Sequence, residues 1–407
     1  MRQIIGALVA TCLAAAPHLL LADPVTAPSS VPGTTSSATP TPPPAATAPT
    51  AADPPAAAPA VPTWANTLAA WGITANGYIA ASYYASNSYP SNIHQFDTEH
   101  NTFQLDEAGL QVAYQPQKGF GGLVDVITGE DAKILDIAEG GSGNYIDVRQ
   151  AFLQYASGPM TIIAGKFLTL AGAEVINPTQ DTNFSRSLLF FDAEPLDHTG
   201  VRATFAVTTT FSFILGVNNG WNVTSTSYGS KTGEAGIAWT PNKTFSLATQ
   251  GYFGKPPPET TGGVELGEKS LIDVVATYNA TSTLTFIANF DWDQQEIPGA
   301  PTATWDGIAL YANYQFNPRW RVSVRGEYLD DKDGYLTGPI DGQHLSEGTV
   351  TFGYAPTSHF ELRLEGRYDS AQTKIFYRTD PSSAYLPNLP LMADSLSEVA
   401  LQGVYKF

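Results

Sequence analysis

The stretch that decides the fold reads Ser397-Glu398-Val399-Ala400-Leu401-Gln402-Gly403-Val404-Tyr405-Lys406-Phe407. Its odd-numbered positions form an apolar row that ends in two aromatic side chains, and its even-numbered positions include Glu398, Gln402 and Lys406. Because successive side chains of a β-strand point to opposite faces, this pattern predicts a strand with one face toward lipid and one toward water. The alternative is the closing strand of a soluble β-domain, whose exposed apolar face would invite pairing with other chains. In a closed barrel the same strand has a neighbour on each edge.

Short and long connections alternate along the rest of the chain. Turn-like segments lie at 116–119, 157–159, 208–210, 241–243, 280–282, 317–319 and 356–358. Longer polar loops lie near 86–100, 129–144, 168–197, 219–231, 254–268, 294–304, 331–343 and 370–394. These seven turns and eight loops make fifteen connections, which predict about sixteen strands. An even number of antiparallel strands, with short periplasmic turns and long extracellular loops, is typical of outer-membrane barrels.

The predicted strands keep the same alternation, and their aromatic residues gather at the strand ends. Leu362 and Leu364, for example, alternate with Arg363, Glu365 and Arg367. The group at the short-turn end comprises Tyr114, Tyr155, Trp239, Phe316, Trp320, Tyr354, Phe360 and Phe407, and the group toward the long loops comprises Trp292, Trp305, Tyr328 and Tyr368. Two such groups resemble the aromatic girdles at the two membrane interfaces. We therefore predict an all-β fold, a transmembrane antiparallel β-barrel over residues 73–407.

Three segments are predicted to precede the barrel. Residues 1–22 combine Arg2 with an apolar run and a small residue at the end, as in a secretory signal peptide. Residues 23–62 consist mainly of Pro, Ala, Thr and Ser and predict a disordered tether, because they cannot bury an apolar core. Residues 63–72 form a short pre-barrel segment, in which Trp64, Leu68 and Trp71 have helical spacing.

Composition excludes some classes of partner and site. Lys and Arg total 20 against 38 Asp and Glu, which argues against nucleic acid as a partner. Cys12, in the predicted signal peptide, is the one cysteine, so we expect no disulfide in the mature chain. The sequence has no phosphate-binding loop and no clustered metal ligands, and we predict no cofactor and no metal.

Two stretches interrupt the strict alternation in a similar way. They run from Leu105 to Leu110 and from Val148 to Leu153. An extra residue in one strand of a pair causes such a break, so β-bulges are expected there. The face on which Arg149 lies is therefore left open.

Several motifs resemble those of the type 2 barrel porins (barrel porin-2), a family of bacterial outer-membrane β-barrels. They are Gly77-Tyr78-Ile79, Phe103 to Leu110, Gly165-Lys166-Phe167, Gly172 to Ile176, Asn183 to Ser187 and His198 to Arg202. The resemblance covers roughly residues 72–407 and implies a pore in the bacterial outer membrane. The terminal Phe407, with Tyr405 before it, also resembles the signal that the barrel-assembly machinery reads.

A barrel of about sixteen strands is wide enough for a water-filled lumen, so we predict passive diffusion of ions and small hydrophilic solutes. The predicted pore-lining residues are Lys166, Arg202, Arg321, Arg325, Arg363, Arg367, Asp291, Glu327, Glu361 and Glu365. In one interpretation these charges pair across strands and keep the inner wall solvated. In the other, an arginine wall on the late strands faces an acidic loop and produces a transverse field.

The loop at 168–197 is the predicted constriction. Its charged residues are Glu174, Asp181, Arg186, Asp192 and Glu194. The apolar run from Leu188 to Phe191 needs a surface to pack on, which the barrel mouth or a neighbouring subunit of a homo-oligomer would provide. An ordinary exterior loop is the alternative.

Two other classes of function stay open. An outer-membrane adhesin or structural anchor would use its loops rather than a pore. A hydrolase would need a nucleophile beside a positioned histidine, and none of the six histidines lies in a recognisable catalytic motif. We therefore predict a channel and not an enzyme, with outer-membrane lipids, the assembly machinery and small hydrophilic solutes as partners.

Overall fold

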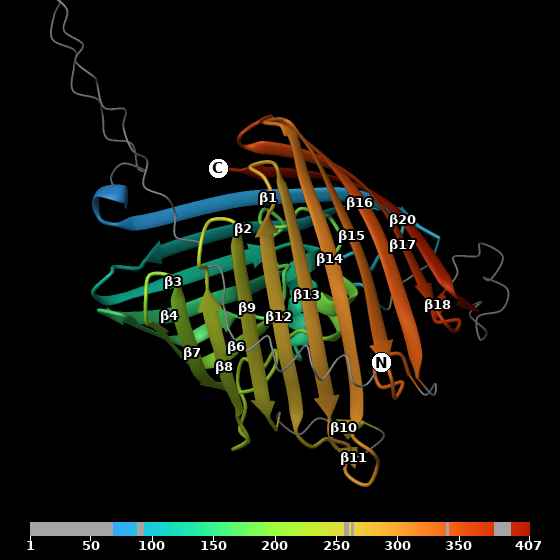
Figure 1. The fold of residues 1–407 in the computed structure, drawn as a ribbon, viewed down its shortest axis with the longest axis horizontal. Helices are drawn as coiled ribbons and strands as arrows, with labels where there is room; N and C mark the ends of the chain where they lie inside the picture. The colour runs from blue at the N-terminus through green and yellow to red at the C-terminus, as the bar shows by residue number, and fades with distance from the viewer. Residues whose placement is uncertain (1–67, 88–92, 256–259, 262–263, 339–341, 378–391) are drawn as a thin grey trace, which may run out of the picture.

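The computed structural model describes residues 68–87, 93–255, 260–261, 264–338, 342–377 and 392–407. Within these residues sixteen strands form one closed antiparallel barrel (Figure 1). They are β1 (Ile73–Ser86), β2 (Thr102–Tyr114), β3 (Gly119–Thr128), β4 (Ile146–Ser157), β5 (Met160–Leu168), β6 (Asp197–Ala206), β7 (Phe211–Asn218), β8 (Thr232–Trp239), β9 (Phe245–Gly254), β12 (Lys269–Asn279), β13 (Leu284–Gln295), β14 (Ala303–Asn317), β15 (Trp320–Asp331), β16 (Gln343–Thr357), β17 (Phe360–Ala371) and β20 (Ser395–Lys406). The predicted fold class and strand number are confirmed, and each predicted short turn joins two neighbouring strands.

The barrel closes where β20 pairs with β1, which lie side by side at the two ends of the colour scale in Figure 1. The closing strand has β17 on its other edge, so both of its edges are paired. Val399 and Leu401 are exposed on its outer face, whereas Glu398 and Gln402 are buried on its inner face. The alternation of the last strand is therefore that of a barrel wall.

The two predicted interruptions are β-bulges. In the β1–β2 pair, Asp106 is the extra residue, because Ala80 pairs with Glu107 and Ala81 with Leu105. In the β3–β4 pair the extra residue is Arg149. The bulge turns the Arg149 side chain into the barrel, where its guanidinium lies 2.8 Å from Glu107 and 2.9 Å from a carboxylate oxygen of Asp125.

The aromatic groups at the strand ends are confirmed with one exception. At the short-turn end, Phe316, Trp320 and Phe407 are each about half exposed or more on the outer face. Trp305 was predicted in the opposite group, and this prediction is wrong: its side chain is fully buried and stacks on Tyr335 with ring centroids 5.2 Å apart. The odd-numbered positions of the first part of β14 face inward, so Trp305 joins the interior packing.

The long connections carry the remaining elements. These are α3 (Glu130–Ala138), α4 (Leu188–Asp192), the β10–β11 pair (Thr260–Thr261, Val264–Glu265) and the β18–β19 pair (Phe376–Tyr377, Met392–Ala393). No helix in the described part of the chain combines the length and apolar character needed to cross a membrane. Residues 68–70 are helical, whereas Trp64, the predicted signal peptide and the predicted tether lie outside the described residues.

Candidate functional site

The connection between β5 and β6 crosses the inside of the barrel. In the ring order β5 is the fifth strand and β15 the thirteenth, eight of sixteen positions away. Nevertheless, residues 181–189 of this connection contact the inner faces of β14 to β17 through hydrogen bonds. We call residues 169–196 the inner loop; in Figure 1 it is the green segment within the wall of strands. The alternative of an ordinary exterior loop does not describe it.

Four arginines of β15 and β17 hold the backbone of the inner loop. Each donates a hydrogen bond to a loop carbonyl: Arg321 to Thr182 at 2.6 Å, Arg363 to Asp181 at 2.9 Å, Arg325 to Ser185 at 2.9 Å and Arg367 to Arg186 at 2.6 Å. Hydrogen bonds from a charged donor are stronger than neutral ones, and buried carbonyls need such partners. These arginines therefore act as a clamp on the loop.

Acidic residues of the same wall accept from the loop amides. Glu365 accepts from the backbone N–H groups of Phe184 and Ser185 at 2.6 and 2.9 Å. Glu327 accepts from the Leu188 N–H at 2.9 Å, where α4 begins. The arginines and glutamates of β15 and β17 thus provide hydrogen-bond partners for both the carbonyls and the amides of the inner loop.

Apolar packing fixes the middle of the loop. Leu188 and Leu189 are fully buried in a cluster with Trp305 and Leu329 of the barrel wall. Phe190 packs instead in a second cluster with residues of the other long connections, including Phe96 and Leu135. The apolar run that needed a packing surface finds it inside the barrel.

The charged residues of the inner loop are mostly engaged within the protein. Arg186 lies 3.1 Å from Asp181 and donates to the carbonyls of Val175 and Ile176, so it organises the loop itself. Glu174 accepts from the Ser187 N–H at 2.6 Å and pairs with Arg325 at 2.7 Å.

Burial changes the protonation of three loop carboxyls. It raises the pKa of Asp181 to about 7, although Arg186 opposes the shift. It raises the pKa of Asp192 to about 8, with a further contribution from the Asp331 carboxylate. The pKa of Glu194 is raised well above its usual range, first by burial and then by Asp273. Removal of these groups from water is the common cause.

The remaining predicted pore-lining residues also lie on the interior side and have partners there. Lys166 contacts Glu139 and lies 3.3 Å from Asp147. Arg202 pairs with Glu234 at 2.8 Å. Glu361 contacts two members of the clamp, Arg321 at 2.6 Å and Arg363 at 2.9 Å. Asp291 lies in an acidic cluster with Glu194 and Asp273, in which the ligand oxygens are within 4.8 Å of one another.

The pore-lining charges are paired across strands and also face the inner loop. Cross-strand pairing is present, as in Arg202 with Glu234. The late-strand arginines do face the loop, but their contacts are mainly with its backbone carbonyls, and Glu174 supplies a direct acidic partner. Most of the predicted pore-lining side chains are buried. Arg321 and Glu361 are the more exposed ones, with 14% and 17% of their side-chain surface open to solvent.

Sequence reasoning missed several interior residues. Thr349 and Thr351 of β16 lie on the inner face, and the period-two pattern of residues 343–353 would have placed them there. Thr351 donates to Glu365 at 2.6 Å and so supports the clamp. His94 and Asp97 are also buried, but they lie in a loop without periodicity, and no signal in the sequence marks them.

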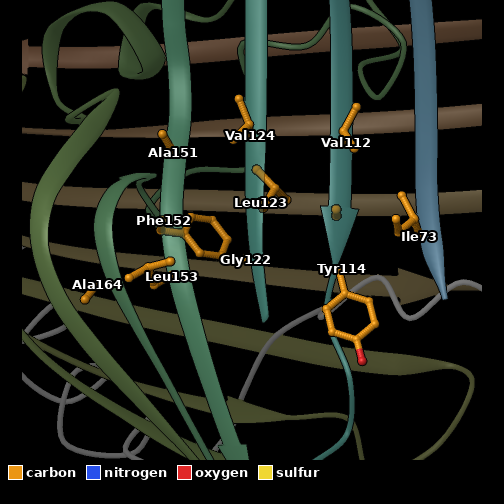
Figure 2. A pocket seen from close by; sticks show the side chains of 11 residues that line it. Ile73, Val112, Tyr114, Gly122, Leu123, Val124, Ala151, Phe152, Leu153 and Ala164 are labelled. Carbon is orange, nitrogen blue, oxygen red and sulfur yellow. The ribbon is translucent and has the colours of Figure 1, made fainter. Parts of the chain in front are cut away.

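A recess on the outer wall has a different character. It is lined by apolar residues of β1 to β5, among them Val112, Val124 and Leu153, which are exposed on the outward face (Figure 2). Such a surface suits lipid or another apolar partner rather than a hydrophilic solute.

Residues 72–394 match the family described as "Putative beta-barrel porin-2, OmpL-like". The chain belongs to this family. It is a porin-like β-barrel of the bacterial outer membrane, as the resemblance implied. The comparison with curated protein sequences gave no match.

Solved structures of outer-membrane proteins share the fold. OprB of Pseudomonas putida is 13% identical, with a TM-score of 0.57, over 84% of this chain and 96% of that chain. In-vitro folded OmpT of Vibrio cholerae is 12% identical, with a TM-score of 0.56, over 82% and 97%. The anion-selective porin of Comamonas acidovorans is 11% identical, with a TM-score of 0.54, over 82% and 99%.

Proposed function

We propose that this protein is a channel through which ions and small hydrophilic solutes diffuse passively across the outer membrane. The observation that carries the proposal is the inner loop, held across a sixteen-strand barrel by the clamp arginines and by Glu327 and Glu365. A barrel of this size leaves room for an aqueous lumen, and a loop fixed within it sets the width of the path.

The charge balance of the interior favours cations over anions. The clamp arginines are engaged with carboxylates and carbonyls, so they contribute little free positive charge. The acidic cluster of Glu194, Asp273 and Asp291 has no comparable set of cationic partners in the described part of the chain. Because burial raises the pKa of Glu194 well above its usual range, this cluster carries its full negative charge, and raises the local concentration of cations in a confined channel, only at alkaline pH.

The experiment is a planar-bilayer recording of purified, refolded protein, with reversal potentials measured in a salt gradient. We expect discrete conductance steps and a reversal potential on the cation-selective side, with the preference for cations increasing as the pH is raised. Folded protein that gives no conductance would overturn the proposal and favour an adhesin or anchor. Hydrolysis of ester or peptide substrates by the same preparation would favour an enzyme.

A clamp variant makes the recording specific to the inner loop. Arg325→Ala combined with Arg363→Ala removes two of the four arginines and should release the loop, with higher and noisier single-channel currents. Arg319→Ala is the matched control, because Arg319 is exposed on a short turn between β14 and β15. Unchanged currents in the double variant would show that the inner loop does not restrict the path of the ions.

The assembly proposed for this barrel is a homo-oligomer. A trimer form is described for OmpT of Vibrio cholerae, and the apolar recess of Figure 2 gives this barrel an outward surface for a subunit contact. Chemical cross-linking in intact outer membranes tests it: cross-linked trimers support the assembly, and monomers alone contradict it.

A further inference from the structure

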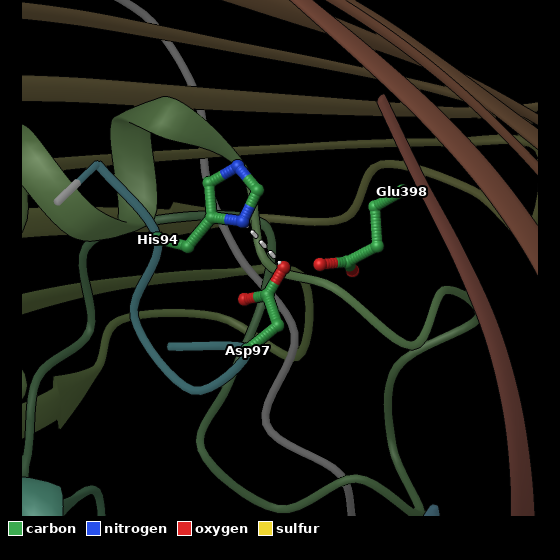
Figure 3. A group of neighbouring side chains, drawn as sticks. All are labelled: His94, Asp97 and Glu398. Atoms are coloured by element: carbon green, nitrogen blue, oxygen red, sulfur yellow. Dashed lines mark ion pairs between the residues drawn. The ribbon is translucent and has the colours of Figure 1, made fainter. Parts of the chain in front are cut away.

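A buried group of three potential metal ligands joins the first long connection to the closing strand. His94 and Asp97 come from the connection between β1 and β2, and Glu398 projects inward from β20. Figure 3 shows the three side chains directed toward one another. One ligand atom from each lies within 4.8 Å of the others, and each residue is at most 3% exposed.

The polar atoms of this group have few partners outside it. Both carboxylate oxygens of Glu398 are buried without a hydrogen-bond partner in the described part of the chain, whereas Nδ1 of His94 and a carboxylate oxygen of Asp97 face each other at 2.7 Å. Leaving buried carboxylates without partners is costly. A protonated His94, 2.7 Å from Asp97, would compensate Asp97 but would leave Glu398 unpaired. Glu398 is therefore the feature that points to a bound cation.

The other face of the His94 ring is already held. Nε2 of His94 lies 3.2 Å from a carboxylate oxygen of Asp369, and Arg367 fixes that carboxylate from 2.8 Å. A carboxylate that accepts from one ring nitrogen of a histidine is the usual partner behind a metal-binding imidazole. With its proton on Nε2, where Asp369 accepts it, the ring can bind a cation through Nδ1 together with Asp97 and Glu398.

The charges of the group also favour a bound cation. With His94 neutral, the carboxylates of Asp97, Asp369 and Glu398 outnumber the guanidinium of Arg367, which lies 4.0 Å from Asp97, by two negative charges. One divalent ion would cancel this excess.

We propose that His94, Asp97 and Glu398 bind one divalent transition-metal ion of the zinc class. One imidazole nitrogen and two carboxylates suit Zn²⁺, whose ligands lie at about 2.0–2.2 Å, better than Ca²⁺ or Mg²⁺, which favour all-oxygen sites. The ion would cross-link the β1–β2 connection to the closing strand. Its effect reaches the inner loop, because Arg367 behind the site also donates to the Arg186 carbonyl at 2.6 Å.

The test uses protein purified from outer membranes, stripped with EDTA and dialysed against ZnCl₂, with bound metal measured by mass spectrometry. We expect about one zinc ion per barrel in the wild type. Glu398→Gln and His94→Gln should lose that ion, whereas His344→Gln should retain it. His344 is a fair control because it is half exposed and pairs with Asp330 outside this group. Equal zinc content in all four proteins would overturn the proposal.

A second measurement covers ligand variants that fail to fold. Co²⁺ added to the stripped wild-type barrel should give visible d–d absorption bands, and Zn²⁺ should abolish them by displacement. A folded wild-type barrel without such bands and without bound zinc contradicts the site. A positive result further predicts that EDTA lowers the temperature at which the barrel loses its folded mobility on a gel, and that ZnCl₂ restores it.

Discussion

Phe407 and Gly77 exchange both of their backbone hydrogen bonds, at 3.0 and 3.2 Å, and so continue the pairing of the last strand with the first. The ring of Phe407 lies against the Cα of Gly77, where an added Cβ would be 2.2 Å from a ring carbon. The terminal aromatic residue therefore packs on the seam at which the barrel closes.

Deleting Phe407 should lower the amount of folded barrel in the outer membrane much more than it lowers secretion. The deletion removes both the seam contact and the predicted signal for the assembly machinery. The fraction of protein with heat-modifiable gel mobility measures the effect. Gly77→Val should act in the same direction because its side chain displaces the ring, and Gly366→Ala is the control, since an added Cβ there meets open space. Normal folded yield after the deletion would contradict the assembly role.

The barrel could be predicted from the sequence because its pattern is local. The outward Leu362 and Leu364 and the inward Arg363 follow from the period of a strand, and the short turns mark the hairpins. Trp305 broke the pattern because an aromatic residue near a strand end suits an interface girdle as well as an interior cluster. Its inward face follows from the alternation of β14, and the cluster that buries it includes Leu188 and Leu189, more than a hundred residues away in the chain.

The site was less predictable than the wall. Periodicity places Arg325 and Glu365 on the inner face, but it gives no partner for either. Their partners are backbone groups of the inner loop, whose path depends on many long-range contacts. The alternation of β20 likewise turns Glu398 inward, while nothing local brings His94 beside it.

The inner loop should be resistant to protease while Glu327 and Glu365 hold its backbone amides. The bond after Arg186 is a trypsin site by sequence, but Arg186 is only 3% exposed. Removing the acceptors of the loop amides with Glu327→Ala and Glu365→Ala should free the loop and permit cleavage there. Mass spectrometry of trypsin-treated, folded barrel detects the cut. Glu130→Ala changes a partly exposed glutamate of α3 and should leave the chain intact. Equal resistance of the variant with Glu327→Ala and Glu365→Ala would show that these two carboxylates do not hold the loop.

Leu364→Arg should impair folding into bilayers. Leu364 is half exposed on the outer face of β17, and an arginine facing lipid near the midplane costs about 2–4 kcal/mol. Tyr368→Arg, on the same face but nearer the long-loop end, should cost only about 0–1 kcal/mol. Unfolding free energies measured by denaturant titration in vesicles compare the two. Equal costs would mean that the two positions do not differ in membrane depth.

Asp192→Asn should stabilise the protein at alkaline pH and leave it unchanged in acid. Asp192 is partly buried at the end of α4, and one of its carboxylate oxygens is buried without a hydrogen-bond partner within the described residues. Removal of the carboxyl from water raises its pKa to about 8. A carboxyl whose pKa is raised on folding favours the folded state fully below its unfolded pKa, 3.8. This contribution declines as the pH rises and is lost once the pH passes the folded value of about 8.

An asparagine cannot ionise, so the variant does not lose stability as the pH rises through the pKa of Asp192. The difference in unfolding temperature between variant and wild type should be near zero at pH 3.5, grow between about pH 4 and pH 8, and remain constant above that. The charges of Lys269 and His94 lower the pKa of Asp192 and so oppose the effect of burial. Because salt screens such charges, all unfolding temperatures are measured at one ionic strength. A constant difference across the whole range would mean that Asp192 titrates normally in the folded barrel and that its carboxyl is open to water.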